Sequence, residues 1–205
     1  MTRTERQAHG FIFQGWVFRK FLKLAYSGEW DIPAKINPLT HKSVSIKTAQ
    51  WKSGIGLGDI LIQYDINEDF EMLVAFYEKK GNKKKVVSMH LVEISIDKWR
   101  QLWGNIRKED LIKFDTLVRS EAGRNLKGKK LDDFRANIQK TKNELFKDYN
   151  GKFSINPKID SDNQRRVQCG LGFKDFFETF NLKCDKISEY DLWGEKIKLS
   201  SICLD

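Results

Sequence analysis

The chain contains few residues that could cross-link it or interrupt its folding. Its 205 residues include three cysteines and three prolines, and no cysteine belongs to a C-x-x-C pair. The scattered Cys169, Cys184 and Cys203 exclude a disulfide framework and argue against a structural zinc site. Such sparse cysteine usage is typical of a reducing compartment, and we expect a cytoplasmic protein.

Long apolar runs are also missing. No stretch approaches the roughly 18 residues of a membrane span. The N-terminal apolar segment contains Arg19 and Lys20 and offers no small-residue cleavage site, so we expect neither a membrane segment nor a signal peptide. Hydrophobic residues make up 40% of the chain, with 14 Phe and 6 Trp, which excludes a disordered protein. A formal net charge of +9 favours an anionic partner such as nucleic acid.

Hydrophobic periodicity predicts alternating helices and strands. A first helix is expected from Glu5 to about Tyr26, with Gln14 on the same stripe as Phe11 and Phe18. Strands are predicted over 29–36, 43–51, 70–78, 86–96, 153–159, 166–170 and 196–203. Helices are predicted over 60–64, 97–106, 111–118, 131–149 and 173–180. This order suits an α+β or α/β layered fold without repeats or a clear domain boundary.

Polar residues alternate with apolar ones along the first two predicted strands. Glu29 and Asp31 share one face of the first strand, and Ser45 and Lys47 share one face of the second. If the strands pair with their apolar faces on the core, two carboxylates, a hydroxyl and an ammonium come together. Carboxylates bind Mg²⁺, which polarises a phosphate, and a nearby lysine can orient the attacking water. The pattern therefore indicates a candidate metal-and-lysine site.

At these residues the sequence resembles the PD-(D/E)xK nuclease superfamily, and small type II restriction endonucleases in particular. Asp31 matches the first acid of that pattern, Lys47 matches its lysine, and Gln14 occupies the place of a frequent helical glutamate. Further similarity is carried by WDIP at 30–33, VSIKT at 44–48, LGDI at 57–60, RRVQC at 165–169 and KDF at 174–176.

The chain departs from the family pattern at two positions. Ser45 replaces the acid of the acid-x-lysine triplet, and Gln14 replaces the helical acid, so both positions are neutral. A metal site would then need another oxygen ligand, and Glu29 is the best substitute because it lies two residues from Asp31. The weaker reserves are Asp59 and Glu71.

The resemblance implies a single-domain α/β nuclease of the restriction-endonuclease-like fold, with a central mixed β-sheet flanked by helices. It implies sequence-specific hydrolysis of double-stranded DNA with Mg²⁺, for which Mn²⁺ is an alternative. Asp31 would be the principal metal ligand and Glu29 a second one. Lys47 would position or activate water, while Ser45 and Gln14 would occupy the places of the two acids. A homodimer and a DNA methyltransferase partner are implied as well.

Basic segments in the second half are the candidate DNA contacts. Within one domain over 1–205, we expect a core over 1–118 and DNA-recognition elements over 119–205. The predicted contacts are Arg119, Arg124, Lys127, Lys129, Lys130, Gln164, Arg165 and Arg166. The first five suit phosphate contact from a flexible segment, and the last three could read base edges in the major groove. The lysine-rich turn over 79–85 is interpreted as solvated surface.

Other functions remain open on sequence grounds. The neutral Ser45 and Gln14 fit a catalytically inactive DNA-binding module of the same fold. A structure-specific or RNA-acting nuclease and a protein-interaction domain are further alternatives. Acids and lysines on a strand face also occur for solubility alone. Asp59 fits a helix N-cap, and the Gln14 amide could serve a buried backbone group.

Overall fold

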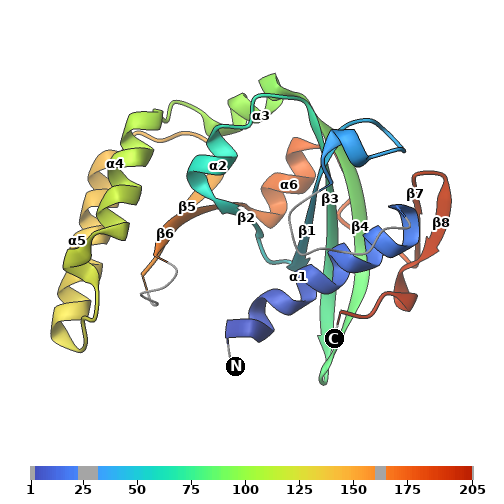
Figure 1. Cartoon of the computed structure of the whole chain (residues 1–205), viewed down its shortest axis with the longest axis horizontal. Helices are drawn as coiled ribbons and strands as arrows, with labels where there is room; N and C mark the ends of the chain where they lie inside the picture. The colour runs from blue at the N-terminus through green and yellow to red at the C-terminus, as the bar shows by residue number, and fades with distance from the viewer. Residues whose placement is uncertain (1–2, 23–31, 160–164, 205) are drawn as a thin grey trace. The chain divides into compact units, whose positions relative to one another are not determined.

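The computed structural model describes residues 3–22, 32–159 and 165–204 (Figure 1). The chain divides into two compact units that are interleaved along the sequence. The first unit comprises Met1–Ile55, Glu68–Ile96 and Phe173–Asp205, and the second comprises Gly56–Asn67 and Asp97–Gly172. Each unit combines strands and helices, so the predicted α/β class is confirmed in this general form.

The first unit is built on a three-stranded sheet with the order β1-β3-β4. Its strands are β1 (Ser43–Gln50), β3 (Phe70–Lys80) and β4 (Lys83–Ile94). β1 runs parallel to β3, whereas β3 and β4 form an antiparallel hairpin. The sheet is therefore mixed, as predicted, although the two strands of the hairpin extend further toward the lysine-rich turn than expected.

Helix α1 (Arg3–Val17) covers one face of this sheet and continues into a π-helical turn over Phe18–Leu22. Phe13 of α1 packs in one apolar cluster with Val44 of β1 and Leu73 of β3, and all three side chains are fully buried. The face of α1 that meets the sheet is centred on Phe13 and Val17, which are fully buried, whereas Phe11 is 49% exposed. The predicted helix is confirmed here, but the stripe predicted through Phe11 is wrong at that residue.

The opposite face of the sheet is covered by α6 (Phe173–Thr179) through aromatic contacts. The ring of Phe76 on β3 lies 5.5 Å from that of Phe177, and Trp51 lies 5.0 Å from Phe173 between ring centroids. Each face of the mixed sheet therefore carries a helix, in agreement with the predicted flanking helices.

The C-terminal part of the first unit forms a small hairpin and a turn. β7 (Glu189–Leu192) pairs antiparallel with β8 (Glu195–Lys198) across a turn whose residues, Trp193 and Gly194, both have positive φ. A 3₁₀ turn over Leu199–Ser201 follows. The strand predicted over 196–203 is therefore shorter than expected, and β7 was not predicted.

The second unit contains a sheet with the order β2-β6-β5. Its strands are β2 (Ile55–Asp59), β6 (Arg166–Leu171) and β5 (Phe153–Lys158), and the β5–β6 pair is antiparallel. β2 lies between the strands predicted over 43–51 and 70–78 and was not itself predicted. The glycines of this segment alternate with Ile55 and Leu57, which are buried and hold the strand in place.

Helices complete the second unit. They are α2 (Ile60–Tyr64), α3 (Ile96–Trp103), α4 (Lys108–Arg119) and α5 (Lys129–Leu145). All four were predicted, with bounds shifted by a few residues. α3 packs on β5 through Trp99 and Trp103, whose rings lie 4.7 and 4.5 Å from that of Phe153. Within the described ranges, no helix has both the length and the apolar character that a membrane span requires.

The strand predicted over 29–36 is wrong in its second half. Ile32 forms one isolated antiparallel bridge with Val44, and Ala34–Ile36 is a 3₁₀ turn. Pro33 lies between these features and lacks the N–H group that a continuing ladder would need. Residues 29–31 lie outside the described part of the chain.

Candidate active site

β1 divides its side chains between the two faces of the mixed sheet. Val44 and Ile46 are 0% and 3% exposed and belong to the apolar cluster beneath α1. Ser45 and Lys47 are half-buried and point to the opposite face. The predicted alternation is confirmed, and it brings the hydroxyl and the ammonium to one face.

The neighbouring strand gives Ser45 and Lys47 an apolar surface. Ser45 is paired with Met72 and Lys47 with Val74, and both β3 side chains are almost completely buried. Lys47 is itself half-buried beside this apolar surface, so a charge on its side chain is screened less than it would be in bulk solvent. This is a suitable setting for a lysine that acts electrostatically.

His90 lies in the same row of the sheet, one strand further away. The register pairs Lys47 with Val74 and Val74 with His90, so the three side chains share one face. The His90 ring packs 5.1 Å from that of Phe177, and its Nε2 lies 2.8 Å from the Ser88 hydroxyl. Burial lowers the pKa of His90, which keeps the imidazole neutral at neutral pH.

His90 is not connected with the candidate site by any local pattern of the sequence. The three histidines are far apart in the sequence, and the row that joins His90 to Lys47 depends on the pairing of β1 with β3. The one local indication is that Ser88 and His90 are two residues apart in the strand predicted over 86–96, which places both side chains on one face of that strand.

Gln14 reaches β1 at its outer edge. Its side-chain amide Nε2 donates to the backbone carbonyl of Ile46 at 3.5 Å, which is a long hydrogen bond. Val44, two residues earlier, donates its N–H to the carbonyl of Ile32 on the same edge. The alternative that Gln14 serves a backbone group is confirmed, whereas its predicted catalytic place stays a prediction.

The two predicted metal ligands, Asp31 and Glu29, lie outside the described residues. The described chain resumes at Ile32, whose carbonyl accepts the Val44 N–H at 2.8 Å. The residue after Asp31 is therefore bridged to the residue before Ser45. The assignment of both acids as ligands stays a prediction.

The reserve acids are engaged elsewhere. Glu71 is paired with Val44 and therefore faces α1 rather than the Ser45 and Lys47 side. It is 2% exposed and accepts a hydrogen bond from the Thr40 hydroxyl at 2.9 Å. Asp59 caps α2, as the sequence indicated, by accepting from the backbone N–H groups of the second and third helical residues at 3.1 and 3.5 Å.

No group of three or more His, Cys, Asp or Glu residues within 3–22, 32–159 and 165–204 is arranged to hold a metal ion. Since Asp31 and Glu29 lie outside these ranges, the described part of the chain does not test the predicted Mg²⁺ site. Ser45 contributes one oxygen donor on the relevant face of β1.

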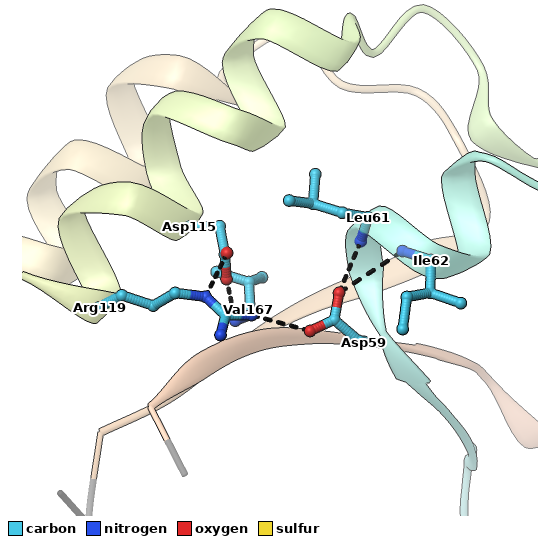
Figure 2. A network of polar contacts seen from close by, with 6 residues as sticks. All are labelled: Asp59, Leu61, Ile62, Asp115, Arg119 and Val167. Carbon is cyan, nitrogen blue, oxygen red and sulfur yellow. Dashed lines mark hydrogen bonds and ion pairs between the residues drawn. The ribbon is translucent and has the colours of Figure 1, made fainter. Parts of the chain in front are cut away.

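Arg119 is held by two carboxylates in the second unit (Figure 2). It ends α4, and its Nη2 lies 2.8 Å from Asp59 Oδ2 while its Nε lies 2.5 Å from Asp115 Oδ2. These ion pairs raise the pKa of the Arg119 guanidinium, chiefly through the hydrogen bond with Asp115. Arg119 therefore joins the start of α2 to the end of α4, and its predicted contact with DNA stays a prediction.

Asp115 extends this network to β6 and was not among the residues predicted from the sequence. Its carboxylate is 4% exposed and also accepts the backbone N–H of Val167 at 2.7 Å. A buried carboxylate is stable only when charged or polar donors surround it, and here Arg119 and the Val167 N–H do so. An aspartate on the predicted helix gave no local signal, because its partner lies 52 residues away.

Arg165 has an internal role. It is 7% exposed, its Nη2 donates to the carbonyl of Gly123, and its guanidinium lies 5.1 Å above the ring of Phe134. A Cβ at Gly123 would overlap both the guanidinium and the Phe134 ring, so a glycine is required there. A guanidinium buried in this way does not present its donors to a base edge, and we leave Arg165 out of the proposed DNA contacts.

The remaining basic candidates lie mainly on the surface. Arg124 is paired with Glu121 at 3.1 Å. Arg166 donates to the side-chain oxygen of Gln168 at 2.8 Å when the Gln168 amide is oriented with its oxygen toward Arg166. The exposed lysines are Lys127 before α5 and Lys129 and Lys130 in its first turn. Gln164 lies outside the described residues. These contacts stay predictions.

Comparisons with protein-family models, with curated proteins and with solved structures found no match to this chain. The functional proposal therefore rests on the resemblance of the sequence together with the geometry of β1 and the residues around it.

Proposed function

We propose that this chain is a metal-dependent endonuclease that hydrolyses phosphodiester bonds of double-stranded DNA at a short specific sequence, in the manner of type II restriction endonucleases. The arrangement of β1 carries the proposal. Ser45 and Lys47 share one half-buried face of this strand. The residue before Ser45 is bridged antiparallel to Ile32, which directly follows Asp31 in the chain.

The elements around β1 support a restriction-endonuclease-like fold. The family pattern consists of a helix, an acid early in a hairpin and a lysine on the following strand. Here α1 precedes the antiparallel bridge of Ile32 with Val44, and Lys47 follows on β1. β1 then pairs with the parallel strand β3, which requires a crossover connection between the two strands. This order agrees with the fold implied by the resemblance.

Each described residue has a definite chemical task in this proposal. The Lys47 ammonium holds the attacking water or the developing charge on the phosphate, and the apolar surface of Met72 and Val74 strengthens its electrostatic effect. The Ser45 hydroxyl occupies the place of the family acid and can donate to a phosphate oxygen or to a water. Gln14 steadies the edge of β1 through its bond to the Ile46 carbonyl.

The proposed ligands of Mg²⁺ are the carboxylates of Asp31 and Glu29, which are hard oxygen donors of the kind that this ion prefers, with Mn²⁺ as an alternative. When bound, the ion would polarise the scissile phosphate and lower the pKa of a coordinated water. The surface lysines Lys127, Lys129 and Lys130 are proposed phosphate contacts. We also propose a homodimer, because two-fold symmetry brings two active sites to the two strands of a palindrome.

The test is a cleavage assay with one active-site variant and one matched control. Plasmid and phage DNA are incubated with the wild type, Lys47→Ala and Lys42→Ala, in Mg²⁺ and separately in Mn²⁺. Lys42 directly precedes β1, and its ammonium pairs with Glu93 at 2.9 Å, so this variant removes the same charge without changing the candidate face. We expect discrete fragments from the wild type and the control. Lys47→Ala should still bind DNA but leave it intact.

Two results would contradict this proposal. Equal cleavage by Lys47→Ala would show that Lys47 is not part of the active site. Intact duplex DNA with every protein and metal would show that the protein does not cleave duplex DNA. Parallel reactions with RNA, single-stranded and branched substrates would then identify an RNA-acting or structure-specific nuclease.

A second candidate function is a DNA-binding module of the same fold without catalysis. The observation that favours it is the neutral Ser45 at the position of the family acid. This candidate predicts a gel shift with a steep salt dependence and no cleavage in either metal.

A further inference from the structure

The hairpin formed by β3 and β4 (Figure 1) concentrates positive charge at its tip. Lysines occupy the ends of both strands, and they are Lys79, Lys80, Lys83, Lys84 and Lys85. The register places Lys79 opposite Lys84 and Lys80 opposite Lys83. Like charges directly opposite one another destabilise an antiparallel pair. The hairpin therefore retains an arrangement of charges that lowers its folding stability.

An open hollow of about 420 Å³ adjoins these lysines. Its lining belongs entirely to the first unit and includes Lys80, Lys85 and Lys186, together with Ser188 and Ser200. Ammonium and hydroxyl groups are donors that suit phosphate oxygens. The hollow thus adds hydrogen-bond donors to the charge of the hairpin tip.

The charge of the hollow is positive after its internal ion pair is counted. Among the described residues that line it, Glu78 is the single acid, and its Oε1 lies 2.6 Å from the Nζ of Lys186. This pair neutralises both of its members. Three lysines against one glutamate leave two positive charges, those of Lys80 and Lys85.

We infer that this basic hairpin surface, formed by Lys79, Lys80, Lys83, Lys85 and the adjoining hollow, binds the phosphate backbone of a DNA duplex. The inference rests on the proposed function, because it adds a second contact to the same DNA. A polyanion would neutralise the opposed lysines, so the stability lost in the free protein returns as binding energy. An anionic membrane fits less well, because membrane-binding surfaces interleave basic residues with Trp, Phe or Leu. The tip over 79–85 has none of these, and the apolar residues that line the hollow are the smaller Val86, Val87 and Ile187.

The test uses Lys80→Glu, which changes the hairpin and the hollow together, and Lys113→Glu as its control. Lys113 is exposed on α4 and carries the same change of net charge outside the surface. Binding to a DNA duplex is measured without divalent metal between about 50 and about 200 mM salt. We expect Lys80→Glu to weaken binding roughly tenfold and to reduce the slope of log K against log salt by about one. The control should stay within about twofold of the wild type.

Thermal unfolding shows whether Lys80→Glu is still folded, so that weaker DNA binding can be told apart from misfolding. Lys80→Glu replaces a Lys–Lys pair by a Glu–Lys pair opposite Lys83, so its Tm should rise by roughly 1–3 °C. A protein that melts higher and binds DNA more weakly has lost a contact rather than its fold.

Several outcomes would overturn the inference. Equal losses in the two variants would mean that net charge alone matters. Tighter binding of anionic lipid vesicles than of DNA, lost in Lys80→Glu, would assign the surface to a membrane. Salt-sensitive DNA binding that Lys80→Glu leaves unchanged would overturn this inference alone. Binding that depends on Lys80 without any cleavage by the wild type would support the surface and contradict the nuclease.

Discussion

Lys47 and His90 lie in one row across the mixed sheet, on the same face and on either side of Val74. Two strand spacings separate their backbones, roughly 10 Å in total. Because burial lowers the pKa of His90, the imidazole is neutral at neutral pH and the row carries the charge of Lys47 alone. His90 therefore adds no positive charge to this row at neutral pH.

The first prediction concerns the pH dependence of stability. An unfolded histidine has a pKa near 6.5, and burial lowers the pKa of His90 in the folded protein, with Asp185 opposing the shift in part. The folded state then binds this proton less readily than the unfolded chain. Its contribution to the free energy of unfolding is complete above about pH 6.5 and declines as the pH falls below that value.

Urea unfolding between about pH 7 and pH 5 measures this effect. We expect the free energy of unfolding of His90→Gln to fall less than that of the wild type as the pH is lowered. His41→Asn, which changes an exposed histidine with positive φ, should follow the wild type. Identical slopes in wild type and His90→Gln would contradict the prediction.

The second prediction compares two half-exposed arginines. Arg119→Ala leaves the buried Asp115 carboxylate with the Val167 N–H as its remaining described donor, so the free energy of unfolding should fall by about 1–3 kcal/mol. Arg124→Ala breaks an exposed pair with Glu121 and should cost less than about 0.5 kcal/mol. Chemical denaturation measures both changes. Similar small losses in the two variants would show that the Asp115 network does not stabilise the second unit.

The third prediction compares two glycines. Gly123→Ala forces a Cβ against the Arg165 guanidinium and the Phe134 ring, and we expect a loss of about 1–3 kcal/mol in the free energy of unfolding. Gly56→Ala introduces a Cβ with nothing within 4 Å and should be within about 1 kcal/mol of the wild type. Thermal melting of the two variants tests the difference. Equal Tm values would mean that Arg165 and Phe134 move away without cost.

The fourth prediction restores the family acid. Ser45→Glu adds a carboxylate to the face that carries Lys47, and a further oxygen ligand should tighten the binding of Mg²⁺. We expect cleavage at a lower concentration of Mg²⁺ than the wild type needs, measured by titrating the metal in the cleavage assay. Ser43→Glu is the control, since Ser43 lies on the same strand face, and its hydroxyl hydrogen-bonds Glu68 at 2.9 Å. If both variants respond alike, position 45 has no special relation to the metal.

Local signals in the sequence predicted β1 and the cap of α2 correctly. The alternation of Val44 and Ile46 with Ser45 and Lys47 is a short-range pattern, and so is an aspartate at the first position before a helix. β2 was missed because Gly56 and Gly58 suggest a loop, whereas burial of the residues between them holds a strand. In that segment the tertiary environment determined the structure.

The roles of the arginines could not be predicted from local sequence. Arg119 meets Asp59 at a separation of 60 residues, and Arg165 meets the carbonyl of Gly123 at a separation of 42. A basic residue in a polar segment has the same appearance whether it binds phosphate or an internal carboxylate. Only the fold separates the two, and it assigns Arg165 to the interior.

The interleaving of the two units has a consequence for synthesis on the ribosome. Every segment of the second unit precedes Phe173, so that unit can fold while the last segment of the first is still being made. During this interval the aromatic face of the mixed sheet around Phe76 has no cover, because α6 is translated last among the helices. The nascent chain should therefore depend on chaperones at this stage, and truncation before Phe173 should leave an aggregation-prone product.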